Sequence, residues 1–308
     1  MRRLLGGRFG IIVIALVGLA FYWFSNQQEV PFTGRQQFNT MSIEDSANLG
    51  AQSYAQILQQ ESSNVLCRTN ARSCGEGDRE LVATVQEIGD RLVRAAIEYE
   101  HELLDAGYRF TPVSDKFNWT YNVVVSNQPN AFCLPGGYVA IYTGILDITG
   151  NYDGTVDLSD IDDVDKLAVV MGHEIGHALA HHGAERMSQA KIAQFGQIAV
   201  GLGMGDMSMQ QQQMVMGALG MATAGGLNAF SRAHETEADK IGLELLARAC
   251  YDPREAPELW ERMGEQGGQR PPPWLSTHPA SEERAENFRT WMPDAVALYE
   301  RRCGVLRE

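Results

Sequence analysis

Two histidines and a glutamate near the middle of the sequence have the spacing of a metal-dependent hydrolase. His173, Glu174 and His177 form the pattern His-Glu-x-x-His within residues 164–187, an apolar stretch with helical periodicity. On a helix, residues four apart share one face about 6 Å apart along the axis, so both imidazoles can bind one Zn²⁺. Glu174 is turned away from the metal, where it can act as general base toward an attacking water. The pattern therefore predicts hydrolysis of a peptide bond with one Zn²⁺ per chain.

A catalytic zinc site also needs a third protein ligand and an open fourth position. His181 lies two turns beyond His173, about 12 Å along the axis, which is too far to join the same metal. Residues 231–239 (SRAHETEAD) supply carboxylates, because Glu235 and Asp239 are four apart and share a helix face. One of them can bind the metal while the other accepts the free N–H of a liganding histidine and fixes its orientation. A purely structural zinc site is disfavoured, since no suitably spaced cysteine closes the fourth position.

These two segments resemble family forty-eight of the metallopeptidases. The resemblance rests on His173–His177 followed by Ser231-Arg232-x-x-Glu235-x-x-Ala238-Asp239, and it covers residues 42–300. It implies an α+β, zincin-like (gluzincin) domain that is mostly helical, with a small sheet flanking the active-site helix. It also implies that Glu235 is the third metal ligand, which leaves Asp239 to orient a histidine.

Two further motifs are similar to the periplasmic quality-control and mitochondrial Oma-type branches of that family. They are residues 130–137 (NAFCLPGG) with the following Tyr-Thr-Gly, and residues 276–279 (STHP) with Arg284. We expect an edge strand along the cleft, where Asn130 and Ala131 pair with an extended substrate by strand addition. The resemblance implies that His278 approaches the zinc, either as a gate or as a stabiliser of the transition state. The alternative for a lone histidine is a surface or packing residue.

The remaining pattern predicts a scaffold for these groups. Amphipathic stretches predict helices, and stretches rich in β-branched and aromatic residues predict the strands of a small sheet. The helices are expected at about 42–58, 80–106, 164–187, 233–249 and from 281 onward, and the strands at 118–126, 131–133 and 138–142. The Gly- and Met-rich residues 195–229 predict a helical hairpin, with a mobile lid as the alternative. We expect disulfides Cys67–Cys74 and Cys250–Cys303 with a free Cys133, against the alternative of five unpaired thiols.

The N-terminus differs in character from the rest of the chain. Arginines at positions 2, 3 and 8 precede an uncharged run from Phe9 to Phe24, which predicts a membrane anchor or a cleaved signal over residues 1–24. Residues 25–40 are polar, contain Pro31 and Gly34, and predict a linker, so that residues 41–308 form the metallopeptidase domain. An uncleaved anchor places the protein in a bacterial inner membrane as a single-pass protein, with the catalytic domain on the periplasmic side.

Charge and motifs together set the predicted function. The net charge is −14 and basic residues form no long run, so nucleic-acid binding is disfavoured. We expect a membrane-anchored zinc metalloendopeptidase that hydrolyses unfolded or misassembled envelope proteins. The alternative is a zinc-containing assembly factor or chaperone that acts mainly by binding clients, although binding alone does not need Glu174. The sequence leaves the natural substrate and the oligomeric state open.

Overall fold

Helices form most of the fold, and a small sheet lies against the helix that carries His173 and His177. The computed structural model describes residues 8–68, 74–150, 161–203, 231–265, 277–278 and 282–306. The helices are α1 (Arg8–Ser25), α2 (Ile43–Gln60), α3 (Glu76–Asp105), α4 (Leu146–Thr149), α5 (Ile161–Leu179), α6 (His182–Gly203), α8 (Arg232–Arg248), α9 (Glu255–Glu265) and α11 (Glu282–Cys303). The strands are β1 (Gln27–Glu29), β2 (Gln36–Phe38), β3 (Thr120–Val124), β4 (Ala131–Leu134) and β5 (Tyr138–Tyr142), and a 3₁₀ turn spans Thr143–Ile145. The predicted mostly helical α+β class is confirmed.

The three-stranded sheet has the order β3-β5-β4. β3 pairs with β5 in parallel, with Thr120 opposite Tyr138, and β4 pairs with β5 antiparallel, with Ala131 opposite Ile141. The turn between β4 and β5 contains Gly136 and Gly137 at φ of +93° and +90°, a conformation that glycine adopts without a Cβ penalty. The predicted edge strand is therefore present as β4, on the side of the sheet that packs against α5.

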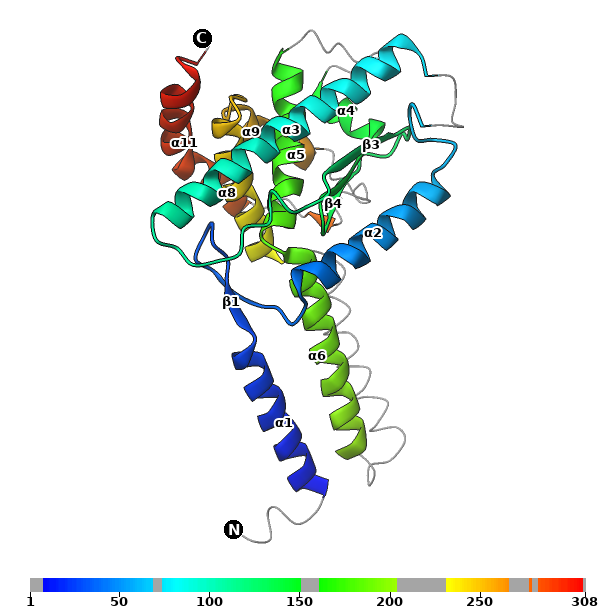
Figure 1. The fold of residues 1–308 in the computed structure, drawn as a ribbon, viewed down its shortest axis with the longest axis vertical. Helices are drawn as coiled ribbons and strands as arrows, with labels where there is room; N and C mark the ends of the chain where they lie inside the picture. Colours follow the sequence, from blue (N-terminus) through cyan, green and yellow to red (C-terminus); the bar gives the residue numbers. More distant parts are fainter. Residues whose placement is uncertain are drawn as a thin grey trace.

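The main core lies between α3, the sheet, α5 and α8 (Figure 1). Buried side chains of this core include Leu92 of α3, Ile141 of β5, Ile175 of α5 and Ile241 of α8, each at most 1% exposed. Burial of each such side chain contributes about 1.5–3 kcal/mol, so this core fixes α5 between the sheet and α8.

Glycines allow α5 and α8 to approach each other very closely. A Cβ on Gly176 would come within 2.8 Å of the carbonyl oxygen of Ala238, and one on Gly242 would come within 3.0 Å of the backbone of Gly172. Any larger residue at these positions would push the helices apart, since backbone atoms cannot yield as a flexible side chain does. The close crossing brings the second half of α5 against the middle of α8.

The structure divides the helix predicted over residues 164–187. α5 ends at Leu179, His181 has a left-handed φ of +56°, and α6 begins at His182. The prediction of one continuous helix was therefore wrong, because periodicity alone does not show a residue in the left-handed region, which non-glycine residues rarely adopt. The break redirects α6 away from α5.

The N-terminal region is more ordered than the sequence suggested. Residues 25–40, predicted as a linker, contain the antiparallel hairpin of β1 and β2, with Gln28 opposite Gln37. Val30, Phe32 and Phe38 are buried, which anchors this segment on the domain. Figure 1 shows α1 and α6 extending together from the rest of the molecule, and the two helices are in contact. No helix within the described ranges has the length and apolar character needed to cross a membrane.

The predicted disulfide pattern is confirmed. Cys67 pairs with Cys74, Cys250 pairs with Cys303, and Cys133 is free. The second bridge ties the end of α8 to the end of α11. Most of the hairpin predicted over 195–229 lies outside the described residues, apart from the end of α6.

Candidate functional site

Four side chains from three parts of the chain converge in the core. Donor atoms of His173, His177, Glu235 and His278 all lie within 4.8 Å of one another. The two histidines come from α5, and Glu235 lies in the first turn of α8, where Ser231 caps the helix by accepting the N–H of His234 at 3.2 Å. His278 precedes α11. The close crossing of α5 and α8 at Gly176 allows the carboxylate to reach both imidazoles.

The separations of these donor atoms fit a tetrahedral metal site. Ligands at 2.0–2.1 Å from a tetrahedral Zn²⁺ are about 3.3 Å from one another. His173 Nε2 lies 3.1 Å from His177 Nε2, and the Glu235 carboxylate oxygens lie 3.5 Å and 3.4 Å from these two nitrogens. Arg284 Nη1 also lies 3.0 Å from Glu235 Oε2, so a cation faces the buried carboxylate. The predicted ligand set therefore fits a single divalent cation.

Asp239 fixes the orientation of the first histidine. Its Oδ1 lies 2.9 Å from His173 Nδ1, so the ring donates there and turns the lone pair of Nε2 toward the cluster. Arg284 donates to both oxygens of Asp239 and stacks over Trp260, with its guanidinium 3.4 Å from the ring centroid. The sequence predicted the contact of Asp239 with a histidine, whereas Trp260 was missed because no local signal marks it.

His177 is oriented by a residue that sequence reasoning missed. His177 Nδ1 lies 2.7 Å from His182 Nδ1, and His182 Nε2 lies 2.9 Å from Glu237 Oε2. A carboxylate accepts only, so His182 donates from Nε2 and accepts at Nδ1 from His177. That tautomer leaves the lone pair of His177 Nε2 facing the cluster. The pair of histidines at 181 and 182 was visible in the sequence, but the turn that directs His182 back was not.

Burial and charge act in opposite directions on the ionisable groups. Burial lowers the pKa of His173, but its hydrogen bonds with Asp239 and Glu235 outweigh burial and raise the pKa to about 9. Burial prevails at His177, where the pKa is well below its usual value. Burial raises the pKa of Glu235, yet hydrogen bonds from His173, His177 and His278 hold it well below the usual range. Without a bound cation the centre therefore holds a negative Glu235 between a protonated His173 and a neutral His177, and binding of a cation would displace the Nε2 proton of His173.

Glu174 and His278 face each other across the cluster. His278 Nε2 lies 3.6 Å from Glu174 Oε1, while His278 Nδ1 lies 3.2 Å from His173 Nε2 and 3.1 Å from Glu235 Oε1. His278 Nδ1 thus lies at about the edge length of a zinc tetrahedron from two of the three predicted ligands. All four residues are at most 2% exposed, so the structure shows a closed site.

Comparison with known proteins decides the family. Residues 94–292 match peptidase family M48. The chain belongs to peptidase family M48. It is 30% identical over 299 residues to the mitochondrial metalloendopeptidase OMA1 of Schizosaccharomyces pombe, covering 95% of this chain and 75% of that protein.

Two other relatives extend the comparison. The mitochondrial metalloendopeptidase OMA1 of Saccharomyces cerevisiae is 31% identical over 291 residues, covering 92% of this chain and 74% of the relative. The beta-barrel assembly-enhancing protease of Yersinia pestis is 30% identical over 175 residues, covering 55% of this chain and 33% of the relative. This M48 protein is therefore a metal-dependent metalloendopeptidase, and the predicted enzyme class and family branches are confirmed.

The predicted location is contradicted by these findings. The relatives that match nearly the whole chain are mitochondrial by name. The interpretation as a single-pass protein of a bacterial inner membrane, with its domain in the periplasm, was therefore wrong. The physical reason is that an uncharged N-terminal run with preceding arginines reports hydrophobicity but not the compartment.

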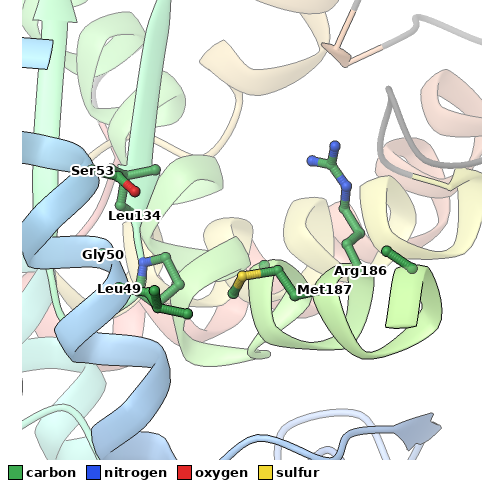
Figure 2. A pocket seen from close by; sticks show the side chains of 9 residues that line it. Leu49, Gly50, Ser53, Leu134, Arg186 and Met187 are labelled. Atoms are coloured by element: carbon green, nitrogen blue, oxygen red, sulfur yellow. The ribbon is translucent and has the colours of Figure 1, made fainter. Parts of the chain in front are cut away.

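A pocket of this M48 domain opens between α2, the end of β4 and the start of α6 (Figure 2). Its volume is about 320 Å³. Figure 2 shows Met187 reaching from α6 toward Leu49 and Gly50 of α2, while Arg186 projects from α6 in another direction. Burial lowers the pKa of Arg186, and the charge of Glu235 opposes that shift. The lining is otherwise mostly apolar: Leu49, Gly50, Ser53, Leu134, Pro135, Gly183, Met187 and Ala190.

The two predicted substrate contacts on β4 differ in their surroundings. The Asn130 carbonyl accepts the N–H of Tyr142 at 3.0 Å within the sheet, and Ala131 is only 1% exposed. Antiparallel pairs alternate, so Ala131 and Cys133 direct their backbone groups away from β5. Of these two, Cys133 is half-buried and Ala131 is buried. Cys133 is therefore the more accessible of the two positions for a substrate strand that pairs with the edge of β4.

Proposed function

We propose that this M48 protein is a zinc-dependent endopeptidase in which His173, His177 and Glu235 bind the metal and Glu174 is the general base. The observation that carries the proposal is the convergence of three donor groups at the edge lengths of a zinc tetrahedron. Two imidazoles and one carboxylate are a donor set typical of catalytic zinc, because one position is left for the reaction.

The side chains divide the chemistry between them. When bound, zinc would polarise the peptide carbonyl and lower the pKa of the attacking water. Glu174 would take a proton from that water at its carboxylate as the C–O bond forms, and deliver it to the amine nitrogen as the C–N bond breaks. Asp239 and His182 would hold the ligand rings in place, since each contacts the Nδ1 of one ring.

Extended polypeptide is the substrate form that fits β4. A peptide could pair with the edge of β4 at Cys133 through backbone hydrogen bonds. The neighbouring side chain of that peptide would then reach the pocket beside Leu134. Folded proteins do not present a free strand of this kind, so we infer that unfolded or misassembled proteins are cleaved. The name of the relative from Yersinia pestis, a protease linked to assembly, is consistent with such substrates.

The proposal that the pocket binds a substrate side chain can be tested separately. Met187 is half-buried on the lining, so Met187→Trp should fill part of the space without touching the metal ligands. We expect a higher KM and a shift of cleavage toward sites with small residues, with unchanged metal content. Cleavage-site profiling by mass spectrometry measures this, and an unchanged profile would remove the pocket from substrate recognition.

The alternative is a zinc-containing assembly factor that works by holding clients. A buried carboxylate at position 174 next to the cluster argues against it, because a binding role has no use for a base there.

Proteolysis of an unfolded model protein with and without a chelator distinguishes the two. We expect cleavage of reduced, unfolded substrate, loss of cleavage with chelator, and recovery with one zinc per chain, measured by elemental analysis. Chelator-insensitive cleavage, or client binding without cleavage, would overturn the proposal.

A further inference from the structure

A second buried cluster of charged and polar side chains lies behind the metal ligands. Its members are His182, Glu185, His234 and Glu237 from α6 and α8, together with Thr33 and Arg35 from the N-terminal segment. The four helix residues are each at most 4% exposed. The proposed mechanism uses none of them directly apart from His182.

Arg35 is the cation at the centre of this cluster. Its Nη2 lies 2.8 Å from Glu185 Oε2, and its Nε lies 2.6 Å from Glu237 Oε2. The Thr33 hydroxyl also donates to Glu237. Burial lowers the pKa of Arg35, but hydrogen bonding to Glu185 and the charges of both glutamates outweigh burial and raise it. The guanidinium is therefore held between two buried carboxylates that come from α6 and α8.

A continuous chain of contacts leads from Arg35 to the metal ligand. Glu237 Oε2 accepts from Arg35 and from His182, and His182 Nδ1 accepts from His177 Nδ1. Each of these hydrogen bonds determines the donor of the next one, because a carboxylate cannot donate and a neutral imidazole has one donor and one acceptor. With a carboxylate at its Nε2 and the Nδ1 of His177 at its Nδ1, His182 donates from Nε2 and accepts at Nδ1.

A second branch supports the same arrangement. His234 Nε2 lies 2.9 Å from Glu185 Oε2, and its ring stacks on His182 with centroids 4.4 Å apart. His234 directly precedes the proposed ligand Glu235 in the chain. Arg35 therefore ties together the two glutamates that hold the stacked rings of His182 and His234.

We propose that Arg35 is a positioning residue for the metal ligand His177, acting through Glu237 and His182, so that the N-terminal segment is part of the catalytic centre. This inference rests on the proposed function in that His177 binds the metal. It predicts that displacement of the β1–β2 hairpin, whose loop contains Arg35, weakens metal binding without any change in the ligands themselves.

The first experiment compares Arg35→Met with Arg248→Met. Arg248 also contacts two glutamates, at 2.7 Å from Glu102 and 2.9 Å from Glu244, but at the far end of α8. We expect Arg35→Met to weaken zinc affinity by about 10–100-fold, as loss of a partner that orients a ligand does, and to lower kcat more than it changes KM. Arg248→Met should lower the melting temperature but keep zinc affinity. Equal zinc affinities in the wild type and Arg35→Met would overturn the proposal.

A second readout does not depend on activity or on metal. In metal-free protein with ¹⁵N-labelled histidine, the chain of contacts requires the proton of neutral His177 on Nδ1, which NMR distinguishes from the Nε2 tautomer. We expect Arg35→Met to weaken this preference and Arg35→Lys, which keeps the charge but not the fork, to have a smaller effect. An unchanged His177 tautomer in a folded Arg35→Met would also reject the proposal, even if the wild type proved inactive as a peptidase.

A double variant covers the possibility that Arg35→Met leaves buried charge and unfolds. Arg35→Met with Glu237→Gln removes both charges of the contact. If the two residues act along one chain, the double variant should lose no more zinc affinity than the weaker-binding single variant. Fully additive losses of zinc affinity would mean that Arg35 and Glu237 act independently, which would contradict the proposal.

Discussion

Arg284 donates two hydrogen bonds to Asp239, from Nε to Oδ2 at 2.6 Å and from Nη2 to Oδ1 at 2.7 Å. The same Oδ1 accepts from His173 Nδ1. Asp239 is therefore held from both sides, and Arg284 orients the ligand ring through it. Burial raises the pKa of Asp239, but the charge of Arg284 and the hydrogen bonds of His173 and Arg284 outweigh burial and lower it.

Arg284→Lys should weaken metal binding although it preserves the charge. A lysine ammonium cannot make the two parallel bonds or stack flat on Trp260, so Asp239 would lose its fixed orientation. We expect zinc affinity to fall about 10–100-fold, measured by competition with a chromophoric chelator. Arg289→Lys is the matched control on the same helix, because its side chain is 65% exposed and pairs with the nearby Glu286. Equal losses in both variants would mean that Arg284 acts through α11 as a whole.

Glu174→Gln should separate catalysis from metal binding. The amide keeps the shape of the side chain but cannot take a proton, so we expect about one zinc per chain and a rate lowered by at least about 10²–10⁴-fold. Glu235→Ala should instead lose both metal and activity, because it removes a ligand. Elemental analysis and cleavage of an unfolded substrate measure both. Full zinc occupancy in Glu235→Ala would show that the third ligand is misassigned.

The proposed ligand set came from the sequence in two steps: helix geometry pairs the candidate residues, and the family resemblance chooses Glu235 over Asp239 as the third ligand. Four-residue spacing puts His173 beside His177, and Glu235 beside Asp239, before any tertiary contact forms. The structure adds the crossing of α5 and α8, which depends on Gly176 lying against Ala238. Nothing in the spacing of either helix alone determines that crossing.

The contacts of His182 and Arg35 could not be predicted from the sequence. On a continuous helix His182 would point about 140° away from His177, because five residues turn the chain by about 500°. The left-handed His181 breaks the helix and brings the two Nδ1 atoms together. Arg35 lies in a polar segment whose strands are three residues long, too short for a periodic pattern. Its partners Glu185 and Glu237 are about 150 and 200 residues away, so no local signal connects them.

Acid should weaken the fold in part through Glu185. Burial raises the pKa of Glu185, but hydrogen bonds from His234 and Arg35 outweigh burial and lower it to about 2. A group with a depressed folded-state pKa stabilises the fold above its unfolded pKa of about 4.3, and this contribution is lost as the pH falls toward 2. We expect the difference in unfolding free energy between wild type and Glu185→Gln to shrink by on the order of 2 kcal/mol from pH 5.5 to pH 3. Urea unfolding of metal-free protein measures it, and a difference that stays constant over this range would contradict the assignment.

His278 has two possible roles, and the structure favours one. As a gate, its imidazole would occupy the position that the attacking water needs; as an oxyanion donor, it would stand nearby and stabilise the transition state. His278 Nδ1 lies 3.2 Å from His173 Nε2 and 3.1 Å from Glu235 Oε1, at the corner where a fourth ligand would sit. With the cluster at most 2% exposed, a polypeptide cannot reach these donor atoms in the arrangement that the structure shows.

His278→Ala should therefore raise basal proteolysis. If the imidazole stabilises the closed arrangement by about 1.4 kcal/mol, its removal increases the open fraction and the rate about tenfold. An oxyanion donor gives the opposite result, a loss of about a hundredfold or more. Initial rates on an unfolded substrate at equal zinc occupancy distinguish the two outcomes.

His278→Gln serves as a further variant, because its amide can still donate a hydrogen bond but binds zinc poorly. A gate predicts release in both variants, whereas an oxyanion role predicts partial retention of rate in His278→Gln alone. Unchanged rates and unchanged zinc affinity in both would leave His278 a packing residue.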